Sequence, residues 1–105
     1  MNKRERMSYE ARAQIIKALG HPVRLWIVDQ LEAGERCVCE LVDPLGLDFS
    51  TISKHLSVLK QAGIIESDKR GKKVFYKLRV PCILNFMGCV EAVLKNSAKD
   101  QACLI

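Results

Sequence analysis

The hydrophobic period of the chain changes at Gly63, from a helical repeat before this glycine to a strand-like alternation after it. Upstream, a tight turn over residues 46–48 separates two helical segments, a short one over about residues 38–45 and a longer one over residues 50–62. Ser50 is placed to cap the longer helix, and Gly63 to end it. This order of elements predicts a helix-turn-helix.

A β-hairpin is expected directly after the second of these helices. Residues 64–67 and 74–78 alternate in the manner of strands, and they flank Gly71, which can supply the positive φ that a hairpin turn needs. The chain is therefore predicted to be mainly α, with a two-stranded β wing: a winged helix-turn-helix.

Two further helices are predicted before this unit. The first covers residues 8–19, and Gly20-His21-Pro22 ends it. The second begins at Pro22 and stops at Gly34. Their expected core positions recur at helical spacing: Ala11, Ile15, Ala18 and Leu19 in the first helix, and Val23, Ile27 and Leu31 in the second, with Trp26 beside them.

The last predicted helix runs from Pro81 to about Asn96, and its apolar stripe covers roughly half the circumference at 100° per residue. A stripe this wide indicates two partners, the domain's own core and a second subunit. The stripe consists of Ile83, Leu84, Phe86, Met87, Val90, Val93 and Leu94. Residues 97–105 are expected to form a flexible tail. The 105 residues correspond to a single domain.

Composition narrows the class of protein further. With 28% charged and 49% apolar residues the chain is too apolar for disorder, and no apolar run approaches the ~18 residues of a membrane span. The polar first residues do not resemble a secretory signal, so a cytoplasmic location is expected. Five cysteines without an export signal indicate free or metal-binding thiols rather than a disulfide framework.

The positive charge is concentrated in one part of the chain. Between Asp48 and Arg79 there are eight basic and three acidic residues, so this segment carries the entire net charge of +5. A solvated basic face is one reading, but the segment coincides with the predicted helix and hairpin. In that setting the excess indicates a binding surface for duplex DNA.

The candidate DNA-binding residues lie on the outer face of the 50–62 helix and at the hairpin tip. Ile52, Leu56 and Leu59 form the inward stripe of this helix, and the opposite face carries hydroxyls, an amide and a cation that can approach base edges and phosphates. His55 is either a DNA contact or a histidine packed at the edge of the core, and His21 is read as structural. The candidates are Ser50, Thr51, Ser53, Lys54, His55 and Ser57 on the helix, and Lys69, Arg70, Lys72 and Lys73 at the tip.

Cys37 and Cys39 are the candidate metal ligands, at the start of the short third helix. In an ideal helix they would point about 200° apart, so they can share an ion only if the first turn is loosened or lies outside the helix. An ion bound there would distort the element that positions the recognition helix, which is a physical basis for a switch. A helix N-terminus is expected to lower the thiol pKa. The alternative is that each cysteine packs as a small hydrophobe.

Further thiolates could come from the C-terminal part of the chain. Cys82 and Cys89 are about 10 Å apart along one helix, too far for one ion, so packing is the expected role of both unless a cysteine from elsewhere meets them. Cys103 lies in the expected tail.

The chain resembles the ArsR/SmtB family of bacterial winged-helix repressors, which leave DNA when they bind metal or metalloid ions. The resemblance spans about residues 9–95, and four runs carry it: Ala18-Leu-Gly-His-Pro-Val-Arg-Leu, Cys37-Val-Cys-Glu-Leu, Ser50-Thr-Ile-Ser-Lys-His-Leu-Ser-Val-Leu-Lys-Gln-Ala-Gly and Gly71-Lys-Lys-Val-Phe-Tyr-Lys-Leu. It implies a homodimer through the first and last helices, and a thiolate box like that of the arsenic- and cadmium-responsive members. Val42 stands where the arsenic type often has a third cysteine, and residues 1–36 lack the cysteines of the cadmium/lead type. The third ligand is therefore Cys82, Cys89 or Cys103, or the ion takes only two.

The sequence thus predicts a cytoplasmic, homodimeric repressor that binds palindromic operator DNA and is released by As(III), or by Sb(III), Cd(II) or Pb(II), with no obligatory cofactor and no membrane partner. One alternative keeps the fold and makes the thiols a redox or persulfide sensor. Another is a winged helix that binds proteins. A small thiol oxidoreductase is disfavoured because the chain lacks Cys-x-x-Cys, a nucleotide-binding glycine loop and an acid–base constellation. The chain is not expected to be an enzyme.

Overall fold

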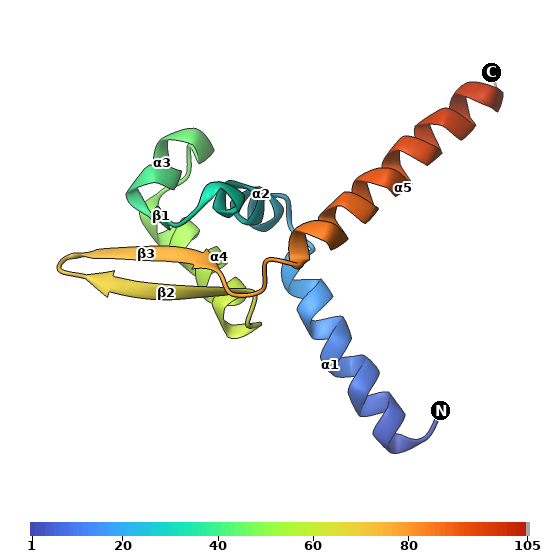
Figure 1. Cartoon of the computed structure of the whole chain (residues 1–105), viewed down its shortest axis with the longest axis horizontal. Helices are drawn as coiled ribbons and strands as arrows, with labels where there is room; N and C mark the ends of the chain where they lie inside the picture. The colour runs from blue at the N-terminus through green and yellow to red at the C-terminus, as the bar shows by residue number, and fades with distance from the viewer. Residues whose placement is uncertain (105) are drawn as a thin grey trace.

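The computed structural model describes the backbone of residues 1–104 and the side chains of residues 1–97. It has the predicted winged helix-turn-helix architecture, with α3 and α4 as the helix-turn-helix and β2 and β3 as the wing (Figure 1). The elements are α1 (Lys3–Leu19), α2 (Pro22–Gln30), the 3₁₀ helix η1 (Leu31–Ala33), β1 (Arg36–Cys37), α3 (Cys39–Leu45), α4 (Phe49–Gln61), β2 (Ile65–Arg70), β3 (Lys73–Leu78) and α5 (Ile83–Leu104). In the part of the chain with described residues, no helix is long and apolar enough to cross a membrane.

Side-chain caps set where the helices begin, and two of these differ from the prediction. α1 starts at Lys3, not Ser8, because the side chain of Asn2 accepts a hydrogen bond from the Glu5 N–H at 2.8 Å. α4 is capped by Asp48 rather than Ser50, since the Asp48 carboxylate accepts from the Thr51 N–H at 2.8 Å. Hydrogen bonds from Thr51, first from its side-chain hydroxyl and then from this N–H, lower the pKa of Asp48 below its usual value.

The sheet has three strands in the order β1-β3-β2, so the prediction of a two-stranded wing is incomplete. β2 and β3 form the antiparallel hairpin, and Gly71 at its tip has φ 63°, as expected from the sequence. β1 adds two residues to the other edge of β3, with Arg36 opposite Tyr76 and Cys37 opposite Phe75. A two-residue strand has too little alternation to be visible in the sequence.

The core lies where α2, α3 and α4 meet the base of the hairpin. The largest fully buried side chains all come from these elements: Ile27, Val28, Leu41, Ile52, Leu56, Leu59 and Ile65. The inward stripe predicted for α4 is confirmed, as is the stripe of α2, where Ile27 and Leu31 are buried and Val23 packs against the core. These packed elements, α2, α3, α4 and the sheet, are called the body below. In the body the apolar stripe of α4 faces the core, and the polar face of this helix is exposed to solvent.

α1 and α5 extend away from this body as two diverging arms, with both termini far from the wing (Figure 1). The radius of gyration is 16.5 Å, against about 13 Å for a compact domain of this length. In α1 only Ala18 and Leu19 are buried, so the prediction of Ala11 and Ile15 as core residues of the single chain is wrong. α1 has few neighbours because only its last turn reaches the body.

α5 begins at Ile83, not Pro81, and its backbone continues to Leu104 where the sequence predicted a loose tail from Ser97. Ile83, Leu84 and Met87 pack on the core. The rest of the predicted stripe is exposed, with Val93 63% and Leu94 66% accessible. The stripe therefore divides as expected, one part on the chain's own core and one part free for another surface.

Candidate nucleic-acid interface and thiol pair

The outer face of α4 carries the polar residues that the sequence predicted. Ser50, Lys54 and Ser57 are exposed, and Gln61 continues the same stripe toward the end of the helix. Thr51 and Ser53 are half-buried on its two flanks. No carboxylate lies on α4 after its cap at Asp48, so the face can approach a phosphate backbone without like-charge repulsion.

His55 is half-buried, and its imidazole contacts residues of the α1–α2 turn and of α2. Its ring lies 4.4 Å, centroid to centroid, from that of His21, and its Nδ1 lies 3.3 Å from Nη1 of Arg24. Burial, followed by the positive groups of His21 and Arg24, lowers the pKa of His55. These contacts favour the packed reading of His55 over a DNA contact. His21 is structural as expected, because its Nδ1 accepts from the Val23 N–H and caps α2.

The four predicted cations of the wing tip differ in whether an ion pair already holds them. The Arg70 guanidinium donates to both carboxylate oxygens of Glu35, at 2.6 and 2.9 Å, and to Asp68 at 3.0 Å. It also lies 4.8 Å from the ring centroid of Phe75. Among the described side chains, Lys69, Lys72 and Lys73 make no such ion pair. These three lysines are therefore the more available phosphate contacts, and Arg70 braces the wing against the segment before β1.

The two predicted metal ligands lie side by side. Cys37 is the last residue of β1 and Cys39 the first of α3, and the Cys39 thiol donates to the Cys37 sulfur with a separation of 2.7 Å. The geometric condition stated above is met because Cys37 lies outside the helix. Cys37 is buried and Cys39 is exposed, so the pair can be reached from one side.

The expectation of a lowered thiol pKa is wrong for Cys39. Its hydrogen bond to Cys37, partial burial and the proximity of that second sulfur raise the pKa of Cys39, while the ammonium of Lys73 opposes the shift. α3 has only seven residues, so its N-terminus is a weak source of positive potential. A thiophilic ion must therefore displace protons from this pair.

A cavity of about 350 Å³ joins the thiol pair to the candidate DNA-binding elements, a juxtaposition that the sequence analysis missed. It is lined by Cys37, Val38, Cys39, Phe49, Ser53, Lys72, Lys73, Val74 and Tyr76. Ser53 belongs to α4, and the two lysines belong to the wing tip and β3. Cys37 also pairs with Phe75 of β3, so the thiol pair is joined to the wing through the sheet.

The other described cysteines do not join this pair. Cys82 and Cys89 are exposed, so their expected role as packed residues is not met by the single chain. Cys103 lies outside the residues whose side chains are described. Among the described residues, no three His, Cys, Asp or Glu side chains gather around a common point. The site within residues 1–97 thus has two thiols.

Comparison with known proteins identifies this arrangement. Residues 21–67, from the cap of α2 into β2, match the family model described as bacterial regulatory protein, arsR family. The arsenical resistance operon repressor of Staphylococcus xylosus is 36% identical over 97 residues, 92% of either chain. The transcriptional repressor SmtB of Mycobacterium tuberculosis is 42% identical over 69 residues, which are 66% of this chain but only 51% of that protein. The chain thus aligns with about half the length of SmtB.

A solved structure agrees with the sequence relatives. The homodimeric winged helix-turn-helix DNA-binding domain of a possible ArsR-family transcriptional regulator from Mycobacterium bovis superposes with a TM-score of 0.80 at 26% identity. The match covers 95% of this chain and 93% of that domain. These relatives are transcriptional regulators and not enzymes. The chain belongs to the arsR family of bacterial regulatory proteins.

Proposed function

We propose that this chain is a homodimeric transcriptional repressor that binds duplex operator DNA through α4 and the wing, and that As(III) bound at Cys37 and Cys39 releases it. One observation carries the proposal: the two thiols share a cavity with Ser53 of α4 and with Lys72 and Lys73 of the wing. The proposed ligands of the ion and three of the proposed DNA-binding residues thus line the same cavity. An operator-binding protein works where the DNA is, in the cytoplasm.

The DNA-binding half of the proposal is supported by the outward face of α4 and the unpaired lysines of the wing. An exposed helix of this polarity suits the major groove, and the lysines suit the flanking phosphates. The homodimer is supported by the homodimeric domain from M. bovis and by the exposed apolar residues on α1 and α5. A dimer would present two α4 helices to a palindromic site.

The effector half is supported by the nature of the two ligands. Thiolates are soft donors that suit As(III), Sb(III), Cd(II) and Pb(II), and the relative from S. xylosus is named as an arsenical resistance operon repressor. A third position on the ion would be filled by solvent, by a cysteine of the partner subunit or by Cys103. Cys82, Cys89 and Cys103 remain the candidates for such a group.

Ion binding would move the wing relative to α4. An ion bound by both thiolates replaces the S–H···S hydrogen bond that joins them in the free protein, so the spacing of the pair changes. Since Cys37 belongs to the wing sheet and Cys39 to the helix before α4, this change acts between two proposed DNA-binding elements.

The test is fluorescence anisotropy of the reduced protein on a labelled duplex of its own upstream DNA, titrated with arsenite and then with cadmium. We expect saturable binding of the duplex and its release by arsenite. Cys37→Ser and Cys39→Ser should bind DNA normally and lose the release, while Cys89→Ser shows whether a thiol outside the pair contributes a third ligand. If both serine variants still respond to arsenite, the proposed site is wrong.

A thiol redox sensor is the second candidate, favoured by the direct contact of the two sulfurs. Peroxide would oxidise the two thiols to a disulfide and be reduced to water, with no ion present. Release of DNA by peroxide but not by arsenite or cadmium, reversed by dithiothreitol, would establish it. Release by arsenite in the presence of a reductant supports the ion sensor instead.

A further inference from the structure

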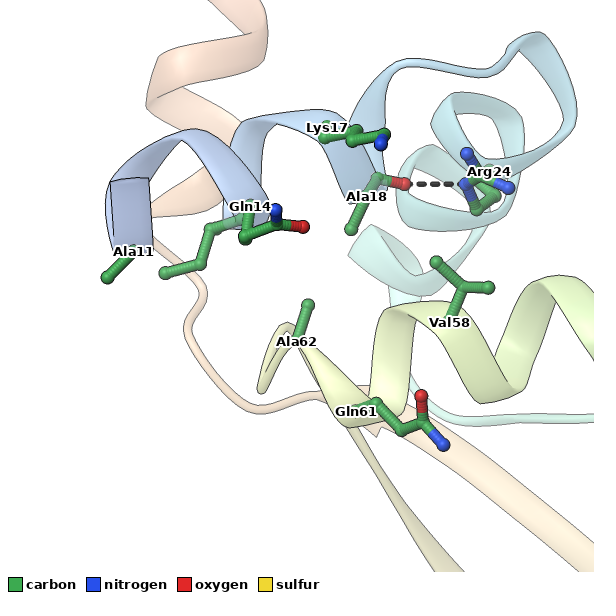
Figure 2. A pocket seen from close by; sticks show the side chains of 9 residues that line it. Ala11, Gln14, Lys17, Ala18, Arg24, Val58, Gln61 and Ala62 are labelled. Atoms are coloured by element: carbon green, nitrogen blue, oxygen red, sulfur yellow. Dashed lines mark hydrogen bonds between the residues drawn. The ribbon is translucent and has the colours of Figure 1, made fainter. Parts of the chain in front are cut away.

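A second cavity, of about 560 Å³, lies between α1, the start of α2 and the second half of α4 (Figure 2). Its lining contains two cations, two amides and five small or apolar residues, with no carboxylate. These residues are Ala11, Gln14, Ile15, Lys17, Ala18, Arg24, Val58, Gln61 and Ala62. The site shares no residue with the thiol cavity, and it lies on the other flank of α4.

The two cations stand on the same rim of this cavity. Figure 2 shows the Lys17 side chain extending toward Arg24. Arg24 is held in place because its Nε donates to the Ala18 carbonyl at 2.6 Å and its Nη1 lies 3.3 Å from the ring of His55. Neither cation forms an ion pair with any described residue. An anion bound in this cavity would be attracted by both cations.

The place of the cavity indicates which anion it would meet. Gln61 belongs both to its lining and to the outward stripe of α4, so a duplex lying along that stripe would bring a backbone strand across the opening. Sugars and phosphates need different surfaces, and the cavity has both. Val58 is 37% exposed and suits the sugars, while Lys17 and Arg24 suit a phosphate.

We infer that Lys17 and Arg24, assisted by the amides of Gln14 and Gln61, bind the sugar–phosphate backbone of operator DNA on the flank of α4 that faces α1. The inference rests on the proposed function. It extends the DNA-binding surface beyond α4 and the wing: the wing lysines hold the backbone on one flank of the recognition helix, and this rim holds it on the other. Such contacts fix the register of α4 in the groove without reading sequence.

The experiment measures the salt dependence of duplex binding for Lys17→Gln, with Lys95→Gln on the outer part of α5 as a control of equal charge. Each phosphate contact contributes a slope of about 0.9 in log Kd against log salt, so two copies of Lys17 contribute about 1.8. We expect Lys17→Gln to lower the slope by about that amount and to weaken binding roughly tenfold at 0.15 M salt. Lys95→Gln should match the parent protein.

A second variant, Gln14→Glu, keeps both cations and adds a carboxylate one helical turn from Lys17. It should weaken binding, because the carboxylate repels the phosphate and competes with it for the Lys17 ammonium. Both Lys17 and Gln14 are exposed, so unchanged thermal unfolding is expected and is checked in parallel. If both variants bind DNA like Lys95→Gln, the inference is wrong while the proposed function stands. If the parent protein binds no duplex, both fail.

Titration with inorganic phosphate and pyrophosphate in the absence of DNA separates a DNA-backbone site from a site for small anions. Millimolar or weaker binding of both, with the slope change above, supports the DNA backbone. Tight pyrophosphate binding that Lys17→Gln abolishes, with an unchanged DNA slope, would overturn the inference in favour of a small phosphate ligand.

Discussion

The body formed by α2, α3, α4 and the sheet differs from the two arms in how it satisfies its apolar side chains. In the body, residues such as Leu41, Ile52 and Leu56 are inaccessible to water, whereas on α5 Val93 and Leu94 remain mostly exposed. The body thus has a complete core from one chain. The arms leave much of their apolar surface exposed to water, so covering it with a second surface would stabilise them.

The largest effect is expected from Leu56→Ala, which removes a fully buried side chain from the centre of the body. We expect a loss of about 2–5 kcal/mol in the free energy of unfolding, because the cavity left behind cannot collapse. Urea unfolding measures it at two protein concentrations. A loss that disappears at high concentration would show that the body is not self-sufficient.

Val93→Asp should weaken dimerisation through the arms and leave the stability of the body unchanged. A charge in the exposed apolar stripe should raise the dimer dissociation constant by about thirtyfold, or roughly 2 kcal/mol, and leave the body folded. Sedimentation equilibrium measures the first effect and circular dichroism the second. Glu91→Asp, an exposed and charge-conserving change on the same helix, is the control. Unchanged dimerisation would remove α5 from the interface.

DNA affinity should depend on the free lysines of the wing, in addition to Lys17, and not on Lys95 at the outer part of α5. Lys72→Ala is expected to lower the salt slope of duplex binding by about 1.8 for two copies. Arg70→Ala should lower it less, because Glu35 and Asp68 already neutralise that guanidinium. An equal loss for both would mean that Arg70 leaves its ion pairs on binding.

The smallest effect is expected on the pH dependence of folding stability, through His55 in the body. The pKa of His55 is lowered on folding, so the unfolded chain binds its proton more readily. Stability should be constant above about pH 6.5 and fall as the pH drops from there toward the folded pKa. Urea unfolding between pH 7.5 and 5 tests this, and His55→Gln should flatten the profile. Asp48 does not interfere, since its lowered pKa costs stability only below about pH 4.

Much of the candidate site could be predicted because its parts are local. The outward face of α4 follows from helical period. The Cys-x-Cys spacing identified the two thiols, but their convergence depends on the boundary between β1 and α3, which only the structure shows. The ion pair of Arg70 with Glu35 could not be predicted, since the partners are 35 residues apart and meet only when β1 joins the sheet. It changes which cations of the wing are free.

The order of the helices and wing strands, the buried stripes of α2 and α4 and the placement of the positive charge follow from the sequence alone, because each depends on neighbours within a few turns or strands. Only the tertiary structure decided which surfaces share a cavity. It placed the thiols beside Lys72 and Lys73, and Lys17 beside Arg24 on the other flank of α4. The physical reason is that packing, and not local periodicity, sets the distance between elements far apart in the chain.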